Sequence, residues 1–114
     1  MPIHWGMTER PRPIFSLRED DVEFEDHIDH FVIHLGEAVD ALQDAEAAND
    51  QDLLDDLSTS MATEAAEAGY PDLDKLARRV RRAAQQADKL AIQQSLIELT
   101  DLSRRVRLGH RGAA

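Results

Sequence analysis

Three histidines stand at spacings that place them on one side of a helix. His27, His30 and His34 occupy positions i, i+3 and i+7, and two imidazoles four residues apart, such as those of His30 and His34, can share a Zn²⁺ or Ni²⁺ ion. These histidines lie on the polar flank of an apolar face, however, and no other residue completes a tetrahedral set of ligands. We therefore expect a solvated helix flank, with no metal and no cofactor.

Other residues capable of chemistry form no recognisable site. The chain has no cysteine, which excludes a thiolate nucleophile and a thiolate metal centre. Carboxylates are abundant between residues 19 and 74, but no pair has a basic or apolar neighbour that would perturb it. None of the patterns G-x-x-x-x-G-K-[ST], H-E-x-x-H and G-x-S-x-G occurs. The sequence predicts a protein that is not an enzyme.

Apolar residues recur at intervals of three and four along most of the chain, as in amphipathic helices. Ser16 followed by Glu19 fits a capping box at the start of the first helix. The expected helices span 16–48, 50–68, 71–86 and 88–108. Their inward residues are Phe24, Ile28, Phe31, Leu35, Val39, Leu42, Leu53 or Leu54, Leu57, Met61, Ala65, Ala68, Leu73, Leu76, Ala77, Val80, Ala83, Ala84, Ile92, Leu96, Leu99, Leu102 or Ser103, and Val106.

Four such helices joined by short turns can bury their apolar stripes only against one another. The fold class is therefore expected to be all-α, an antiparallel up-and-down four-helix bundle. Residues 1–15 contain three prolines and are expected to form an extended N-terminal arm. Residues 16–108 are expected to form the bundle, and residues 109–114 a frayed C-terminal tail.

Charge divides the chain into segments. Residues 1–18 carry a balance of +2, residues 19–74 hold 19 acidic side chains and no Lys or Arg, and residues 75–114 carry +7. The two larger segments either pair with each other within the bundle or leave a basic face for an acidic partner. The net charge of −10 argues against nucleic-acid binding. No apolar run of about 18 residues suggests a membrane span, and we expect a cytoplasmic protein.

The outward face of the second expected helix carries unusually small side chains. An exposed helix face ordinarily carries long charged side chains, but between residues 59 and 66 this one does not. Small side chains leave the backbone accessible to a partner, although alanine is also the best helix former and can fill a surface position for that reason alone. Both interpretations stay open for the residues of this face, which are Asp52, Asp55, Thr59, Ala62, Thr63 and Ala66.

From about Val22 to Val106 the chain resembles a histidine-containing phosphotransfer (HPt) domain of bacterial two-component phosphorelays. The segment 31–35, with the Asp50 that follows it, resembles the family's first bundle helix and the start of the next. The segment Leu53–Met61 resembles the approach to the phosphorylatable histidine, and Ala65–Leu73 resembles the small residues, glycine and leucine beyond it. The resemblance covers about three quarters of the chain.

The family's signature, histidine followed by two residues, lysine and glycine, is absent. Counting back from Gly69, its positions hold Thr59, Ala62 and Thr63, and no histidine lies between His34 and His110. In the family, the imidazole attacks a receiver's aspartyl phosphate, the lysine neutralises phosphoryl charge and the glycine admits the partner. Thr59 offers a neutral hydroxyl, which is a poor nucleophile without a base.

The resemblance therefore implies a module that docks a response-regulator receiver or a histidine kinase without carrying phosphate. It places the partner-binding residues at Asp55, Thr59, Ala62, Thr63 and Ala66. A second hypothesis is an unrelated helical protein–protein interaction module whose likeness is architectural only. A third is a phosphotransfer protein that uses another histidine, although His30 and His34 stand where the family has no phosphohistidine.

Overall fold

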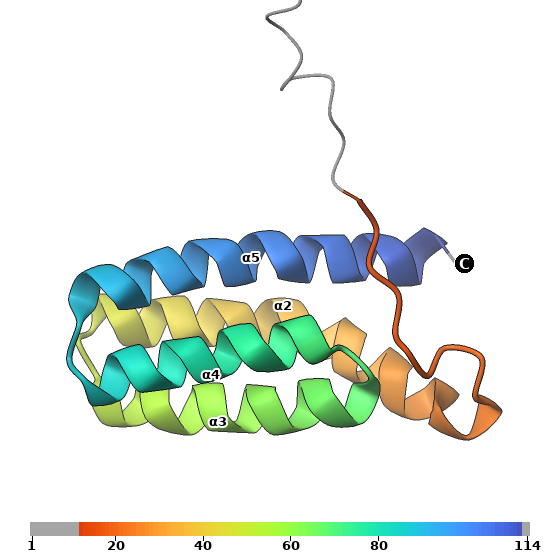
Figure 1. The fold of residues 1–114 in the computed structure, drawn as a ribbon, viewed down its shortest axis with the longest axis horizontal. Coiled ribbons are helices and arrows are strands. Elements are labelled where there is room, and N and C mark those ends of the chain that lie inside the picture. Colours follow the sequence, from red (N-terminus) through yellow and green to blue (C-terminus); the bar gives the residue numbers. More distant parts are fainter. Residues whose placement is uncertain (1–11, 113–114) are drawn as a thin grey trace, which may run out of the picture.

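The computed structural model describes residues 12–112, which form an antiparallel four-helix bundle (Figure 1). A short 3₁₀ helix, η1 (Val22–Phe24), leads into α2 (Glu25–Ala47), and α3 (Gln51–Ala68), α4 (Pro71–Gln85) and α5 (Lys89–Gly112) follow. Each helix packs against its neighbour in sequence, and α5 closes the ring against α2. The described residues contain no strand. The predicted all-α four-helix bundle is confirmed, and none of its helices is long and apolar enough to cross a membrane.

The turns between the helices follow from local chemistry. The Asp50 carboxylate accepts a hydrogen bond from the Leu53 N–H (3.0 Å) at the start of α3, and the Asp88 carboxylate accepts one from the Ala91 N–H (3.1 Å) at the start of α5. Gly69 ends α3 with a φ of 88°, the left-handed conformation that glycine adopts without a Cβ clash. These three residues fix where one helix stops and the next begins.

The core contains the apolar stripes that the sequence predicts. In α2, α4 and α5 nearly every expected inward residue is buried, and in α3 Leu54 takes the buried position while Leu53 is 42 % exposed. Leu57 is only half-buried, packed against the edge of the core. Small residues are buried in α3 and α4, the most extensively packed pair of helices. They are Ser58, Ala62, Ala65, Ala68, Ala77, Ala83 and Ala84.

The predicted capping box at Ser16 is wrong. The Ser16 hydroxyl accepts a hydrogen bond from the Arg18 N–H (2.9 Å) and donates one to the Ala68 carbonyl at the end of α3. The Leu17 N–H donates to the Gly69 carbonyl (2.9 Å). Ser16 thus satisfies a carbonyl that α3 leaves without an intrahelical partner, rather than starting a helix of its own. Residues 12–21 form a strap that crosses the end of the bundle (Figure 1).

The expected frayed tail at 109–114 is wrong for its first four residues, because α5 continues to Gly112. The strap explains the extension. The Ile14 N–H donates to the Arg105 carbonyl (3.0 Å), and the Arg105 Nε donates to the Arg12 carbonyl (2.9 Å). On the other side, His110 Nε2 lies 2.7 Å from Asp29 Oδ1 of α2. These tertiary contacts hold turns of α5 that the sequence pattern alone does not stabilise.

Replacing Gly109 by alanine should destabilise the protein although alanine is the better helix former. A Cβ at Gly109 would overlap the Ile14 carbonyl oxygen and lie 2.9 Å from its carbon, so the strap must move. We expect the melting temperature to fall by about 5 °C, which corresponds to about 1 kcal/mol. Gly36→Ala is the matched control. Its Cβ meets only the mobile end of the Arg107 side chain, and this variant should gain about 0.5–1 kcal/mol. A stabilised Gly109→Ala variant would contradict the strap.

Candidate functional site

The outer face of α3 carries the residues that the sequence singles out, with one exception. The side chains of Thr59, Thr63 and Ala66 are exposed, and Asp55 is half-buried. Ala62, which we predicted to lie on this face, is only 6 % exposed, so that prediction is wrong. The neighbouring helices bury more of the α3 surface than its apolar stripe alone. Small side chains allow these helices to pack closely, so that Ser58 and Ala62 are buried as well. We call Thr59, Thr63 and Ala66 the α3 strip.

The hydroxyls of the α3 strip are engaged within the helix. Thr59 Oγ1 donates to the Asp55 carbonyl oxygen (2.8 Å) and lies 3.4 Å from the Asp55 carboxylate. Thr63 Oγ1 donates in turn to the Thr59 carbonyl oxygen (3.2 Å). A hydroxyl whose proton is directed to a backbone carbonyl is not activated as a nucleophile. The strip is therefore a surface of small, neutral side chains.

Asp55 is held by α4. Arg81 Nε lies 3.1 Å from one carboxylate oxygen of Asp55, and Gln85 Nε2 lies 3.3 Å from the other. This ion pair joins the acidic segment to the basic one, as the pairing interpretation of the charge pattern predicts. Arg78 pairs with Asp74 within α4, and Arg79 pairs with Glu98 of α5. Three of the four arginines of α4 thus find partners inside the bundle, and exposed pairs of this kind contribute little to stability.

A hollow of about 340 Å³ lies at the end of the α3 strip. Leu17 and Arg18 of the strap line it, together with Ala66, Gly69, Pro71 and Asp74. Leu17 is 79 % exposed, which is unusual for a leucine held in place by a backbone hydrogen bond. Helical periodicity contains no signal for this neighbourhood, because it assigns Leu17 to the first turn of a helix rather than to a strap. The strap brings an exposed apolar side chain next to the small residues of α3.

Tyr70 is the titratable group most altered by the fold. It is 3 % exposed and stacks on Phe31 of α2, with ring centroids 5.7 Å apart. Burial, and then the negative charges of Glu19 and Asp29, raise the pKa of Tyr70 to about 12. Both effects disfavour the phenolate. Tyr70 therefore stays neutral in the folded protein and serves as a packing residue beneath the strap.

The wild type should lose stability at alkaline pH as Tyr70 ionises, and the Tyr70→Phe variant should not show this loss. The phenol ionises near pH 10 in the unfolded chain and near pH 12 in the folded one, so the unfolded state holds fewer protons between these values. The stabilising contribution is complete below pH 10 and is lost as pH rises to 12, a change of about 2 to 3 kcal/mol. Urea unfolding at pH 9 and pH 11 should show about half of this loss, roughly 1.4 kcal/mol, because the folded state still holds most of its proton at pH 11. If the free energy of unfolding falls equally in the wild type and in the Tyr70→Phe variant, Tyr70 is not the group responsible.

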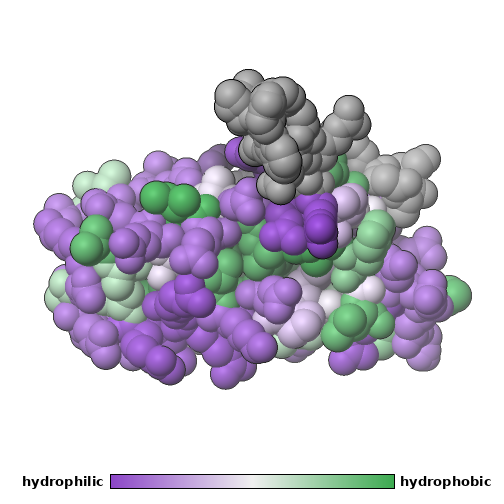
Figure 2. All heavy atoms as spheres, turned by 45° about the horizontal axis from the view of Figure 1, so that its top comes forward, coloured by the Kyte–Doolittle hydropathy of each residue, from purple (hydrophilic) through white to green (hydrophobic). Residues whose placement is uncertain are grey.

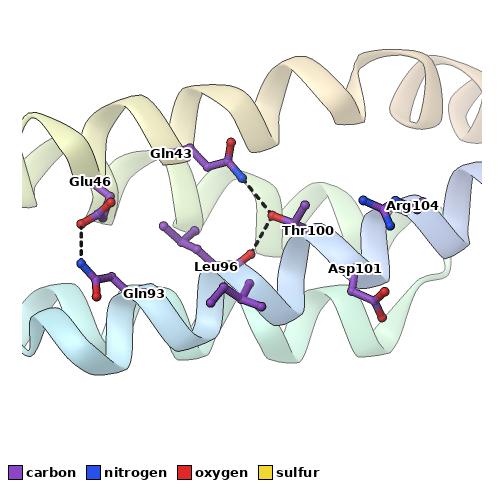
Figure 3. A pocket seen from close by; sticks show the side chains of 8 residues that line it. Gln43, Glu46, Gln93, Leu96, Thr100, Asp101 and Arg104 are labelled. Carbon is purple, nitrogen blue, oxygen red and sulfur yellow. Dashed lines mark hydrogen bonds between the residues drawn. The ribbon is translucent and has the colours of Figure 1, made fainter. Parts of the chain in front are cut away.

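A groove of about 640 Å³ lies between α2 and α5. Four of its polar side chains bind one another in pairs: Gln43 donates to the Thr100 hydroxyl (3.0 Å), and Gln93 donates to the Glu46 carboxylate (3.3 Å) (Figure 3). Figure 2 shows hydrophilic residues over most of the visible described surface, with hydrophobic residues in separate groups. The groove offers no set of polar groups converging on a ligand, as a binding pocket ordinarily does.

The histidines lie along the exposed side of α2. The rings of His30 and His34 have centroids 4.5 Å apart, whereas His27 contacts the edge of Phe24. Within residues 12–112 no group of three or more His, Cys, Asp or Glu side chains could hold a metal ion.

A scan against protein-family models found no match, and searches of curated proteins and of solved structures found none either. A bundle fold supports many functions, so function is inferred from the surface features above.

Proposed function

We propose that residues 16–108 form an HPt-like module that docks a receiver domain of two-component signalling through the α3 strip and does not itself carry phosphate. The observation that carries the proposal is the strip, where Thr59, Thr63 and Ala66 are exposed along one helix. The HPt resemblance places the phosphohistidine at Thr59 and the signature glycine at Thr63, and Ala66 follows them on the same helix. Two of the three signature positions, those of Thr59 and Thr63, lie on this exposed face, and the third, that of Ala62, is buried beside it.

The surroundings of the α3 strip have the composition of a transient interface. Small side chains allow a partner's loops to approach the helix backbone, and Leu17 beside Ala66 supplies an apolar contact. Acidic residues surround this centre, and Asp52, Asp56 and Glu67 are all exposed. A small apolar centre with a polar rim is typical of interfaces that form and dissociate readily. The acidic rim favours a receiver surface with basic residues around its docking loops.

Phosphate transfer is not expected, because the groups that perform it are missing. The hydroxyl of Thr59 donates to a backbone carbonyl and has no imidazole to activate it. Ala62, at the position of the family's lysine, is buried and uncharged. Phosphoryl transfer depends on positioned nucleophiles and on neutralisation of the phosphoryl charge. A phosphothreonine would also be too stable to pass its phosphoryl group onward.

Thr59→His alone should therefore give little or no transfer. Incubation with phosphorylated receivers should leave no more acid-labile label on this variant than on the wild type, because positions 62 and 63 still lack the lysine and the glycine. Circular dichroism should show an unchanged helix content, since Thr59 is exposed. Rapid labelling of the single variant would show that the lysine and glycine matter less than we propose.

Docking itself is tested by titrating the protein against a panel of receiver domains, each with and without the phosphoryl mimic beryllofluoride. At least one receiver should bind with a dissociation constant of about 1 to 100 μM, the range of transient signalling contacts. Binding by no receiver, with binding to helical or other unrelated proteins instead, would favour the alternative of an unrelated interaction module.

A further inference from the structure

His30 and His34 face each other across one turn of α2. Their ring centroids are 4.5 Å apart and their planes are tilted by 51°. Both side chains are exposed, and both line a hollow of about 200 Å³ between α2 and α3 that also contacts Ser60 and Glu64. Two imidazoles at this separation can direct one ring nitrogen each toward a shared ion, because residues i and i+4 are neighbours on a helix surface.

Glu37 provides a second observation. His34 Nδ1 lies 3.1 Å from Glu37 Oε1, one turn further along α2. This contact favours the tautomer that carries its proton on Nδ1, which leaves the lone pair of Nε2 available. Histidines that bind metals characteristically donate their other ring N–H to a carboxylate, which fixes the ring and raises its basicity. His34 therefore already makes the hydrogen bond to a carboxylate that orients metal-binding histidines.

We propose that His30 and His34 bind one divalent transition-metal ion through a ring nitrogen each, with Glu37 as the positioning residue for His34. Imidazole suits Zn²⁺, Ni²⁺ and Cu²⁺, whereas Mg²⁺ and Ca²⁺ prefer oxygen ligands. Because the described residues contain no cluster of three donors, water fills the remaining positions. Such a site is exchangeable and of moderate affinity, unlike a closed structural zinc site.

The site is independent of the proposed function but stands close to the surface that carries it. Ser60 and Glu64, on the α3 side of the hollow, are the immediate neighbours of Thr59 and Thr63 in the sequence. A bound ion would add positive charge at the acidic edge of the α3 strip. Metal binding is measured on the isolated protein, so its failure would leave the docking proposal untouched, and the reverse also holds.

Calorimetric titration with Zn²⁺ and residue-specific NMR with Ni²⁺ test the proposal. We expect one Zn²⁺ per chain with a dissociation constant of about 10 μM, and no response to Mg²⁺. Substoichiometric Ni²⁺ should broaden the ring signals of His30 and His34 first. The imidazoles of His4, His27 and His110 serve as internal controls, because the chain has five histidines.

Matched variants separate a defined site from general attraction to histidines. His30→Ala and His34→Ala should each weaken Zn²⁺ binding at least about tenfold, and His27→Ala on the same helix should change it less than about twofold. Glu37→Gln should weaken binding several-fold and shift the ring ¹⁵N resonances of His34 toward the other tautomer. Equal losses for all three histidine variants, or no Zn²⁺ binding below about 1 mM, would overturn the proposal.

Discussion

Ala62→Arg is expected to unfold the protein or come close to doing so. Ala62 is 6 % exposed and lies in the core cluster between Met61 and Ala65. An arginine there must either bury an unpaired charge or force α3 away from its neighbours. Overpacking alone costs about 1–3 kcal/mol, and an uncompensated buried charge adds several kcal/mol to a total stability of about 5–15 kcal/mol. Thermal unfolding followed by circular dichroism should show a melting temperature lowered by at least about 10 °C.

Ala66→Arg is the matched control, since it makes the same change one helical turn further along α3 at an exposed position. Its melting temperature should stay within a few degrees of the wild type. If the two variants melt alike and near the wild type, Ala62 faces solvent, as the sequence alone had suggested, and the packing of α3 described above is wrong.

The same Ala66→Arg variant should lose receiver binding. Ala66 lies beside Leu17 at the hollow on the end of the α3 strip, and a long charged side chain there would occupy the space that a receiver loop needs. Substitutions that disrupt the centre of an interface commonly cost 2 kcal/mol or more, about a thirtyfold loss of affinity. Isothermal titration against whichever receiver binds the wild type most tightly measures the loss.

Ala47→Arg is the control for charge and size. Ala47 is the exposed last residue of α2, and the C-terminal ends of α2 and α3 lie at opposite ends of the bundle (Figure 1). This variant should bind the receiver within about threefold of the wild type, because the added charge acts only at long range and is screened by salt. Equal losses in both arginine variants would mean that net charge, rather than the α3 strip, governs the association.

Local features of this fold could be predicted from the sequence because they depend on neighbours along the chain. The stripe from Ile28 to Leu42 has the helical period, and Asp50 and Gly69 mark helix ends by chemistry that acts within a few residues. Ser16 was misread for the same reason. Its spacing to Glu19 satisfies a local capping pattern, but its hydroxyl bonds to Ala68, 52 residues away. A tertiary partner displaced the local one.

The candidate site also combines features that depend on local sequence with features that depend on contacts between distant segments. Thr59, Thr63 and Ala66 could be assigned to an exposed face by helical period, whereas Ala62 could not be separated from them. How far the bundle wraps around α3 depends on the close packing of small residues in different helices. The contacts of Asp55 with Arg81 and Gln85, and the position of Leu17 beside Ala66, also join segments distant in the sequence. No periodicity encodes them.

Mapping a bound receiver by NMR shows directly whether docking occurs at the α3 strip. The ¹⁵N-labelled protein is titrated with the receiver that binds it, and backbone amide shifts are followed across residues 12–112. We expect the largest shifts on Thr59, Thr63 and Ala66 and on Leu17 of the strap, with smaller changes along the facing side of α4. Shifts confined to α5 and the α2–α5 groove, with the α3 strip unchanged, would contradict docking at the strip.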